Sequence, residues 1–425
     1  MLLTFYLAIF LRFRLLYFEK TEPLPENCVD SMTSHGFSVC HNRVMYVKLQ
    51  NRDIQSVAKG WFQLEPIHST YIDLSHNNLT ELSSELFNDL PKTVRSVDLS
   101  HNLIERIKND TINNVHLLKV TLKANLIEEV EDGSFESSYL SELDLTDNRI
   151  SDIGFVASLP SSLKVLKLNK NNISNIEDGF FSRLGDVVRL KFAHNHITKI
   201  QADAFRGLTS LKKLDLSHNE ISKIEASGFS GLKELRHLIL DNNLISSFDE
   251  GAFDQLVQLR ELRIKKNNFI EITKNNFARL PETLRFLDLN GNGITDIEID
   301  FFVGVPKDAL DLNNNKLSKI MPNQFKIDYL SELELENNLI TEISPDSFLG
   351  LPRVDYLSLA GNQITEIPQG IARNFKYPVD FEISRNPVTK LQNGAFHGVS
   401  ESHISKVWIT GNKLEVIQGG IFEDI

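Results

Sequence analysis

The chain has 425 residues, of which 41% are hydrophobic, and a formal net charge of −12 at pH 7. Length alone predicts about three domains. The acidic balance argues against a nucleic-acid partner, because proteins that bind phosphate backbones present clustered basic residues.

Residues 1–20 form a hydrophobic leader. Its first eleven residues carry no charge, which is the length of a signal-peptide core, and the stretch is too short to span a membrane. A basic start is missing, and Arg12 and Arg14 stand where small residues near a cleavage site are expected. A cleaved signal peptide is favoured, while a signal anchor and a mis-assigned start stay open as alternatives.

From residue 46 onward the sequence repeats one phrase. "LKKLDLSHNEISKI" at 211–224 returns as "VRSVDLSHNLIERI" at 94–107 and as "LSELELENNLITEI" at 330–343. An Asn fixes the register, and successive copies lie 23 to 26 residues apart. With an earlier copy at 46–57, which has Arg52 in the Asn slot, the chain holds sixteen copies. Self-similarity at this period predicts a solenoid instead of three globular domains.

Within each copy the residue types predict a strand followed by a turn. Leu214 and Leu216 alternate with Lys213 and Asp215, so the leucines point inward and their charged neighbours outward. Such a strand buries its face only by stacking on copies of itself into a parallel sheet. The Asn of the turn, Asn219 in this copy, carries an acceptor and two donors, and is expected to bond backbone groups of its own turn and the next.

A Phe ten or so residues after most of these Asn residues predicts a second buried stack on the opposite side of the sheet. The stretch around it, such as "GFSGLKEL" at 228–235, is too short for more than one or two helical turns.

These residues resemble extracellular-type leucine-rich repeats, over nearly the whole chain after residue 45. The resemblance implies an α/β fold: a right-handed solenoid, or horseshoe, with a parallel sheet on its concave face and short helical or 3-10 turns on its convex face. The expected domains are the leader, an N-terminal cap at 21–45 and a solenoid at 46–425 of about sixteen repeats, open or truncated at its C-terminal end.

The cap is expected because extracellular members of the family commonly cover the first repeat with a disulfide-bonded segment. Cys28 and Cys40, the two cysteines of the chain, lie just before the first copy. A bond between them would stabilise the fold by roughly 3 kcal/mol. The alternative is two unrelated thiols in a cytosolic protein.

Three glycosylation acceptors occur, Asn78-Leu-Thr, Asn109-Asp-Thr and Asn172-Ile-Ser. Asn78 and Asn172 directly follow a repeat Asn, in a slot that should face solvent. Because the chain is rich in Asn, the three motifs are a weak signal.

No catalytic residue is predicted, since the phosphate-binding loop, the zinc-protease motif and the serine-hydrolase elbow are all missing from the sequence. His76 and His101 fill the slot before the repeat Asn in adjacent copies, as do His194 and His218. No carboxylate completes either pair as a metal site. We therefore expect no metal and no cofactor.

The outward positions of the strands are the expected ligand-binding surface. In the middle copies they are often basic, as at Lys167, Lys191 and Lys265, and in the later copies they turn acidic with aromatic residues between. Stacked like charges cost stability, and aromatic residues amid charge have the composition of an interface. The predicted ligand-binding residues are Phe286, Asp288, Asp311, Glu332, Glu334, Glu336, Tyr356, Asp380, Glu382 and Trp408. A merely solvated acidic surface is the competing interpretation.

The resemblance therefore implies a non-enzymatic, extracellular or cell-surface protein that binds a protein or peptide through its concave face. The acidic outward residues favour a basic ligand. Small leucine-rich proteoglycans and Toll-type or chaoptin-type receptor ectodomains are similar, although this chain lacks the proteoglycans' cysteine clusters and the receptors' membrane span. A non-catalytic subunit of a secreted enzyme and an intracellular scaffold are the alternatives. The sequence predicts no oligomeric state.

Overall fold

Each copy of the repeat opens with a short strand whose inward side chains are buried. Leu214 and Leu216 are fully buried in the computed structural model, whereas Lys213 and Asp215 are partly exposed. The next copy repeats this burial 24 residues on, because Leu214 lies beside Leu238 in a parallel pair. The alternation predicted from the sequence is confirmed.

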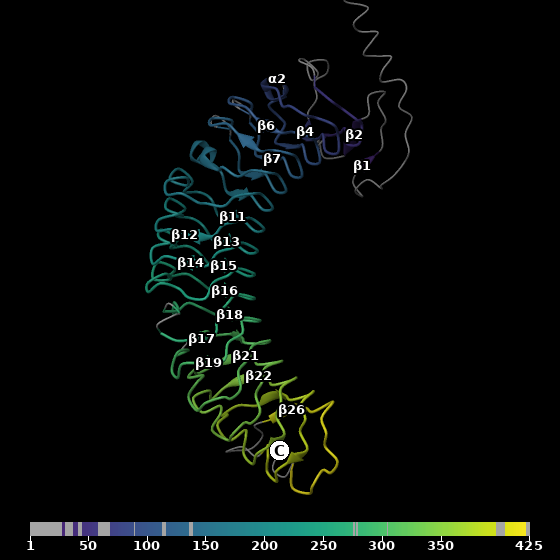
Figure 1. Cartoon of the computed structure of the whole chain (residues 1–425). Helices are drawn as coiled ribbons and strands as arrows, with labels where there is room; N and C mark the ends of the chain where they lie inside the picture. Colours follow the sequence, from purple (N-terminus) through teal and green to yellow (C-terminus); the bar gives the residue numbers. More distant parts are fainter. Residues whose placement is uncertain are drawn as a thin grey trace, which may run out of the picture. The chain divides into compact units, whose positions relative to one another are not determined.

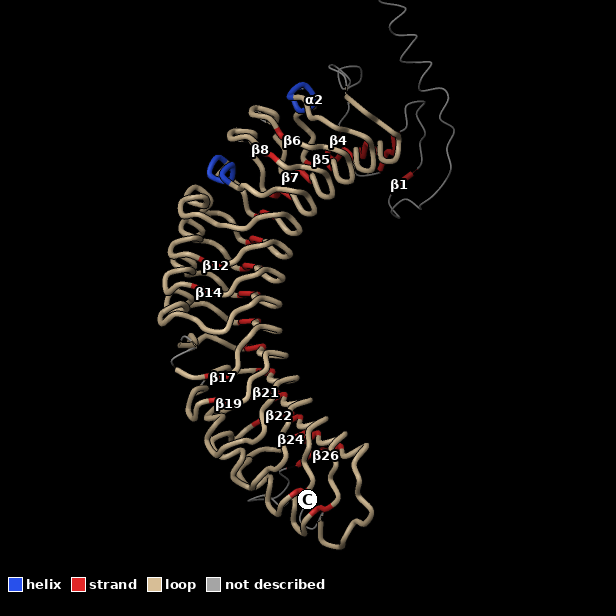
Figure 2. Tube along the Cα trace, viewed as in Figure 1, coloured by secondary structure: helices blue, strands red, loops and turns tan. Residues whose placement is uncertain are grey.

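The structure describes residues 28–29, 37–40, 45–57, 69–88, 90–112, 116–135, 139–274, 277, 279–303, 305–396 and 404–421. The predicted leader at 1–20 lies outside them, as does most of the predicted cap. The chain divides into two compact units, Met1–Asn148 and Arg149–Ile425, here unit 1 and unit 2. Each unit is a stack of repeats, with little helix (Figure 2).

Unit 1 begins with two antiparallel strands and continues in parallel. β1 (Cys28–Val29) pairs with β2 (Phe37–Cys40), and β2 pairs with the first parallel strand. The parallel strands are β3 (Met45–Lys48), β4 (Ser69–Asp73), β5 (Ser96–Asp98), β7 (Lys119–Thr121) and β9 (Glu142–Asp144). On the other side lie the short helix α2 (Ser84–Asn88) and the paired strands β6 (Arg106–Ile107) and β8 (Glu129–Val130).

Unit 2 carries the longer parallel sheet. Its strands are β10 (Val165–Lys167), β11 (Arg189–Lys191), β13 (Lys213–Asp215), β15 (His237–Ile239), β16 (Glu261–Arg263), β18 (Phe286–Asp288), β20 (Ala309–Asp311), β21 (Leu330–Glu334), β22 (Val354–Ser358), β24 (Val379–Glu382) and β26 (Ile404–Trp408). Together with the five of unit 1, these eleven strands give one strand for each of the sixteen predicted copies, within the described residues.

The opposite side of unit 2 is made of turns and shorter strands. It holds the 3-10 helix η1 (Gly154–Ser158) and three two-stranded parallel pairs. These are β12 (Lys199–Ile200) with β14 (Lys223–Ile224), β17 (Glu271–Ile272) with β19 (Asp296–Ile297), and β23 (Glu366–Ile367) with β25 (Lys390–Leu391). In Figure 1 the main strands follow the inner side of the curve of this unit and the short pairs its outer side.

The repeated Asn is buried and satisfies backbone groups in two copies. Asn219 is 7% exposed, and its Nδ2 donates to the carbonyl oxygens of Leu216 and of Phe192 in the preceding copy. Its Oδ1 accepts the backbone N–H of Ile197, also in the preceding copy. The predicted ladder of amides is confirmed within each turn, but its partners outside the turn lie in the preceding copy, not the following one.

The predicted Phe stack fills the space between the sheet and the outer turns. Twelve of the largest fully buried side chains are Phe, and the rings of Phe205, Phe229 and Phe253 stack with centroids 6.2 and 6.4 Å apart. The core of each unit is therefore a set of ladders, Leu behind the strands and Phe behind the turns.

Candidate functional site

The predicted ligand-binding residues of unit 2 lie in two outward columns on adjacent strands. Parallel register aligns Phe286, Ala309, Glu332, Tyr356, Asp380 and Lys406 in the first column. It aligns Asp288, Asp311, Glu334, Ser358, Glu382 and Trp408 in the second. Glu336 lies one outward position beyond Glu334, after the buried Leu335. The structure therefore brings all ten residues onto one surface, which we call the acidic face.

Exposure differs along the acidic face. Glu332 is exposed, and most of the other members are partly exposed. Asp288 is the exception at 8% exposed. Asp288 can therefore act on a ligand through its charge, but it offers little surface for direct contact.

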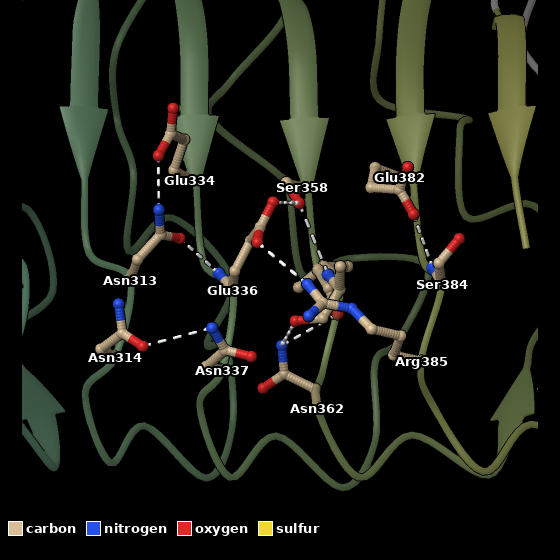
Figure 3. Close-up of polar contacts among 12 residues, drawn as sticks. Asn313, Asn314, Glu334, Glu336, Asn337, Ser358, Asn362, Glu382, Ser384 and Arg385 are labelled. Atoms are coloured by element: carbon tan, nitrogen blue, oxygen red, sulfur yellow. Dashed lines mark hydrogen bonds and ion pairs between the residues drawn. The ribbon is translucent and has the colours of Figure 1, made fainter. Parts of the chain in front are cut away.

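Two of the seven carboxylates are neutralised by cations. Arg385 reaches Glu336 across two copies, with 3.2 Å between its guanidinium and the carboxylate, and Ser358 donates a hydrogen bond to the same carboxylate (Figure 3). The copy between has Gly361 in the slot of Arg385, so no side chain blocks this path. The Nζ of Lys406 lies 3.0 Å from Oδ2 of Asp380.

The other five carboxylates form no salt bridge within the described part of the chain. Asp288, Asp311 and Glu382 each accept a backbone N–H two residues on in the sequence, and Glu334 accepts a hydrogen bond from Asn313. These contacts orient the carboxylates but leave their charge in place. Four of the five, Asp288, Asp311, Glu332 and Glu334, stand on the successive strands β18, β20 and β21.

Burial and mutual repulsion act on the protonation of this column. The pKa of Asp288 is raised to about 6, mainly by burial and also by the charges of Asp311 and Asp241, which together outweigh the lowering by the hydrogen bond from the Asn290 N–H. Burial likewise raises the pKa of Glu334, followed by the charge of Asp311. By contrast, a hydrogen bond from Ser405 and then the ion pair with Lys406 hold the pKa of Asp380 low. Keeping Asp288 and Glu334 ionised therefore costs stability, and no neighbouring cation offsets that cost.

Aromatic side chains stand at the far end of the acidic face. The rings of Tyr356 and Trp408 meet edge to face with centroids 6.2 Å apart, and the Lys406 ammonium lies 5.8 Å from the Trp408 ring centre. Both rings are partly exposed. Phe286, at the other end, lies beneath Arg263, whose guanidinium carbon is 5.6 Å from its ring centre.

Sequence reasoning missed a basic column beside the first half of the same sheet. Lys164, Lys212, Arg236 and Arg260 each directly precede a first-column residue of β10, β13, β15 or β16. The signal was available, since three of these residues recur at intervals of 24. It was overlooked because only residues flanking the inward leucines were considered.

The two cysteines are placed opposite one another by the backbone. β1 and β2 pair in antiparallel register with Cys28 beside Cys40. Cα atoms of residues opposite each other in such a pair lie about 4.5–5.5 Å apart, which is within the range that a disulfide spans. The bond itself stays a prediction.

The acceptor Asn residues are accessible to different degrees. Asn109 and Asn172 are exposed and Asn78 is partly exposed, while Thr111 of the Asn109 motif is buried with its hydroxyl donating to the Lys108 carbonyl. Glycosylation at all three positions stays a prediction.

The predicted histidine pairs stack face to face. Ring centroids are 4.2 Å apart in His76–His101 and 4.0 Å apart in His194–His218. Burial, and then the charge of the partner ring, lower the pKa of His101 and of His194. Within the described ranges, no group of three or more His, Cys, Asp or Glu side chains is placed to hold a metal ion. None of the helices described has the length and apolarity to cross a membrane.

Comparison with protein families matches the repeats directly. A model described as "Leucine rich repeat" matches residues 42–104, 161–221, 209–269 and 308–364, which together are more than half of the chain. A second model of the same description matches residues 136–157 and 281–297.

Among curated proteins, Tsukushi of Gallus gallus is 28% identical over 149 residues, which are 32% of this chain and 32% of Tsukushi. Among solved structures, the TLR13–ssRNA13 complex matches 76% of this chain and 51% of TLR13 at 24% identity, with a TM-score of 0.58. The Drosophila Toll–Spatzle complex matches 92% of this chain and 55% of its counterpart at 17% identity, with a TM-score of 0.69. The chain thus spans about a third of its curated relative and about half of these two structures.

Proposed function

The chain belongs to the leucine-rich-repeat family, and we propose that it is an extracellular, non-enzymatic protein whose acidic face binds a basic segment of a protein partner. The Toll–Spatzle structure is a complex of a similar fold with a protein ligand. That similarity supports binding as the type of function, while the choice of partner comes from the side chains of this chain.

The observation that carries the proposal is the group of four carboxylates on β18, β20 and β21 that form no salt bridge within the described residues. They are Asp288, Asp311, Glu332 and Glu334. Like charges on neighbouring strands destabilise a sheet, and here Asp288 and Glu334 have raised pKa values as a result of burial and of that repulsion. A Lys- or Arg-rich segment laid across the strands would neutralise the column. The energetic cost in the free protein thereby becomes binding energy in the complex.

The aromatic end of the face supplies what charge alone does not. Interfaces are anchored by buried aromatic residues, with Trp and Tyr most prominent. Tyr356 and Trp408 already contact each other, so that little side-chain freedom remains to be lost on binding. A partner with basic residues followed by an apolar anchor fits this arrangement.

A charge-reversal series tests the acidic face. The probe is a Lys/Arg-rich peptide carrying one aromatic residue, measured against the purified full chain at low and at physiological salt. Glu332→Lys, Glu334→Lys and Glu336→Lys combined should abolish binding, and raising the salt should weaken binding to the wild type.

The matched control is the reversal of three exposed carboxylates away from the strands, Glu250→Lys, Glu282→Lys and Glu342→Lys. It changes the net charge equally and should leave most of the affinity. Equal losses in both triple variants would mean that the peptide senses net charge only, and the acidic face would then be ordinary solvated surface.

The extracellular part of the proposal has its own experiment. The full chain with a C-terminal tag is expressed in animal cells, and the intact mass of the secreted product is measured before and after reduction and deglycosylation. We expect secretion, loss of the leader, a bond between Cys28 and Cys40, and glycans on one or more of Asn78, Asn109 and Asn172. Retention in the cytosol with both thiols free would support the intracellular scaffold instead.

A further inference from the structure

The outward side chains of the first half of unit 2 form a basic surface of their own. The surface is defined on the copies that contain β10, β11, β13, β15 and β16. Each copy contributes three outward positions, two on the strand and one just after it, and the residue directly before the first of them. These positions hold ten Lys or Arg residues: Lys164, Lys167, Arg189, Lys191, Lys212, Lys213, Arg236, Arg260, Arg263 and Lys265. They hold three carboxylates, Asp215, Asp241 and Glu261. We call this surface the basic face; in a chain of net charge −12 it is a concentrated exception.

Lys164, Lys212, Arg236 and Arg260, which precede the outward positions, form the rim of the basic face. Backbone hydrogen bonds fix the position of this row. The carbonyl oxygen of Lys212 accepts the N–H of Arg236, and that of Arg236 accepts the N–H of Arg260. Lys164 is joined to Lys212 in the same way through Val188. Since strands in a sheet are spaced by about 4.8 Å, the rim from Lys164 to Arg260 is a row of about 19 Å. Its cations are therefore held in line along the sheet.

Most of these cations lack a counter-charge. Within the described residues, eight of the ten form no salt bridge: Lys164, Arg189, Lys191, Lys212, Lys213, Arg236, Arg260 and Lys265. Arg263 is paired with Glu261, which also accepts a hydrogen bond from His237. The Nε of Arg236 is buried and has no hydrogen-bond partner. Unpaired donors and stacked like charges both cost stability unless a ligand contacts them.

The composition of the face selects among anionic ligands. Its counted positions contain no Phe, Tyr or Trp, whereas proteins that bind single-stranded nucleic acid place aromatic rings for the bases to stack on. Its apolar positions, Val165, Val188, Ala193 and Ile239, are buried or only partly exposed, so the apolar centre of a protein interface is missing as well. What remains is a row of long, flexible cations, which suits a hydrophilic polyanion.

From this arrangement we infer that the basic face binds a sulfated polysaccharide of the glycosaminoglycan type. The rim residues Lys164, Lys212, Arg236 and Arg260 contact successive sulfates, and the outward residues Arg189, Lys191 and Lys213 contact the sugar chain from the sheet. The inference does not rest on the acidic face: the ligand, the strands and the variants are different, so either proposal can fail alone.

The test uses the purified full chain and heparin oligosaccharides as the probe. Lys164, Lys212 and Arg260 are all exposed, so replacing them together with Ser leaves the core intact. This rim variant should bind heparin at least tenfold more weakly, with a shallower dependence of affinity on salt, because fewer counterions are released. Its thermal unfolding should match that of the wild type.

The matched control replaces three exposed lysines outside the basic face, Lys199, Lys223 and Lys233, with Ser. It carries the same change in net charge and should change heparin affinity by less than about twofold, since the removed charges lie away from the row. If the rim and control variants bind heparin equally, the inference is overturned.

Three further probes separate the ligand classes: hyaluronan, which has carboxylates but no sulfate, single-stranded poly(U) RNA, and an oligoglutamate peptide. Each should bind more weakly than heparin of similar length. Binding of hyaluronan as tight as that of heparin would overturn the assignment to sulfate. Tighter, rim-dependent binding of the RNA or of the peptide would overturn the assignment to a polysaccharide.

Discussion

The first half of unit 2, from β10 to β16, and its second half, from β18 to β26, are built on the same types of buried residue and present opposite charges. Leu216 in the first half and Leu335 in the second are both fully buried in equivalent positions. Asn219 and Asn338 donate and accept the same set of backbone hydrogen bonds. At the outward positions of the strands, the charged residues are mainly Lys and Arg in the first half and mainly Asp and Glu in the second.

Local structure pairs some charges of the minority sign in both halves. In the first half the carboxylate of Glu261 is held between His237 and Arg263. In the second half Arg385 and Lys406 are each bound to a carboxylate. These minority charges are neutralised, whereas Asp215 and Asp241 of the first half form no salt bridge within the described residues. Most majority charges likewise form no salt bridge there. Selection for stability alone would mix the signs, so the segregation points to two different ligands.

The shared frame consists of the buried Leu, Asn and Phe ladders. Substitutions in it are expected to lower stability equally in the two halves. Leu216→Ala and Leu335→Ala each open a cavity in the Leu ladder and should lower the free energy of unfolding by about 2–5 kcal/mol. Urea denaturation followed by circular dichroism measures both. A large loss in one half only would show that the halves do not share a frame, and would break the comparison at its base.

The Asn ladder should give a smaller loss, again equal in the two halves. Asn219→Ala leaves the N–H of Ile197 without its acceptor, and it removes one of the two Asn donors from each of the carbonyl oxygens of Phe192 and Leu216. Buried groups left unpaired in this way cost roughly 1–3 kcal/mol. Asn338→Ala should match it. Losses near zero would mean that water reaches these turns, although Asn219 is only 7% exposed.

The frame was predictable from the sequence because it is periodic. Leu216, Asn219 and Phe229 recur in register, and each residue type has one physical role, so strands, turns and the two buried stacks followed. Placement of the outward residues on one surface followed as well. The state of their charges did not: Arg385 reaches Glu336 over 49 residues, past Gly361, and no spacing rule indicates such a contact.

Burial of the outward residues was likewise beyond the sequence. Asp288 on β18 and Glu332 on β21 both occupy outward positions, yet the first is buried and the second exposed, because exposure depends on the side chains beside each of them. The rim residues were missed for a related reason. Lys212 and Arg236 stand one residue before the regular alternation begins, where the pattern of inward and outward positions gives no direction.

The pH dependence of stability separates the halves further. The pKa of Asp288 rises from its ordinary 3.8 to about 6, so the folded protein holds this proton more tightly than the unfolded chain does. Its contribution to stability is therefore present below pH 4 and is lost as the pH rises through about 6. Asp288→Asn keeps the acceptor for the Asn290 N–H and removes the charge.

This variant should be more stable than the wild type at pH 7.5, by on the order of 1 kcal/mol, and the difference should vanish near pH 4. Thermal denaturation at the two pH values measures it, with the exposed Asp296→Asn as control. Binding of the basic peptide should also weaken as the pH falls below 6, because Asp288 takes up a proton. Heparin binding should not weaken over that range, because sulfates stay ionised and Lys and Arg stay charged; a parallel loss of both activities would contradict two separate ligands.

The smallest expected effect on stability sharpens the comparison most. Lys213 is an outward residue of the basic face, beside the buried Leu214, and forms no salt bridge within the described chain. Lys213→Ala should change the free energy of unfolding by no more than about 0.5 kcal/mol, since it touches neither ladder. It should nevertheless weaken heparin binding a few-fold and leave binding of the basic peptide unchanged. Glu332→Ala, at an equivalent outward position of β21, should do the reverse. If Lys213→Ala destabilises the fold as much as Leu216→Ala, the outward residues are part of the frame, and the charge of each half is then a requirement of folding instead of a device for binding.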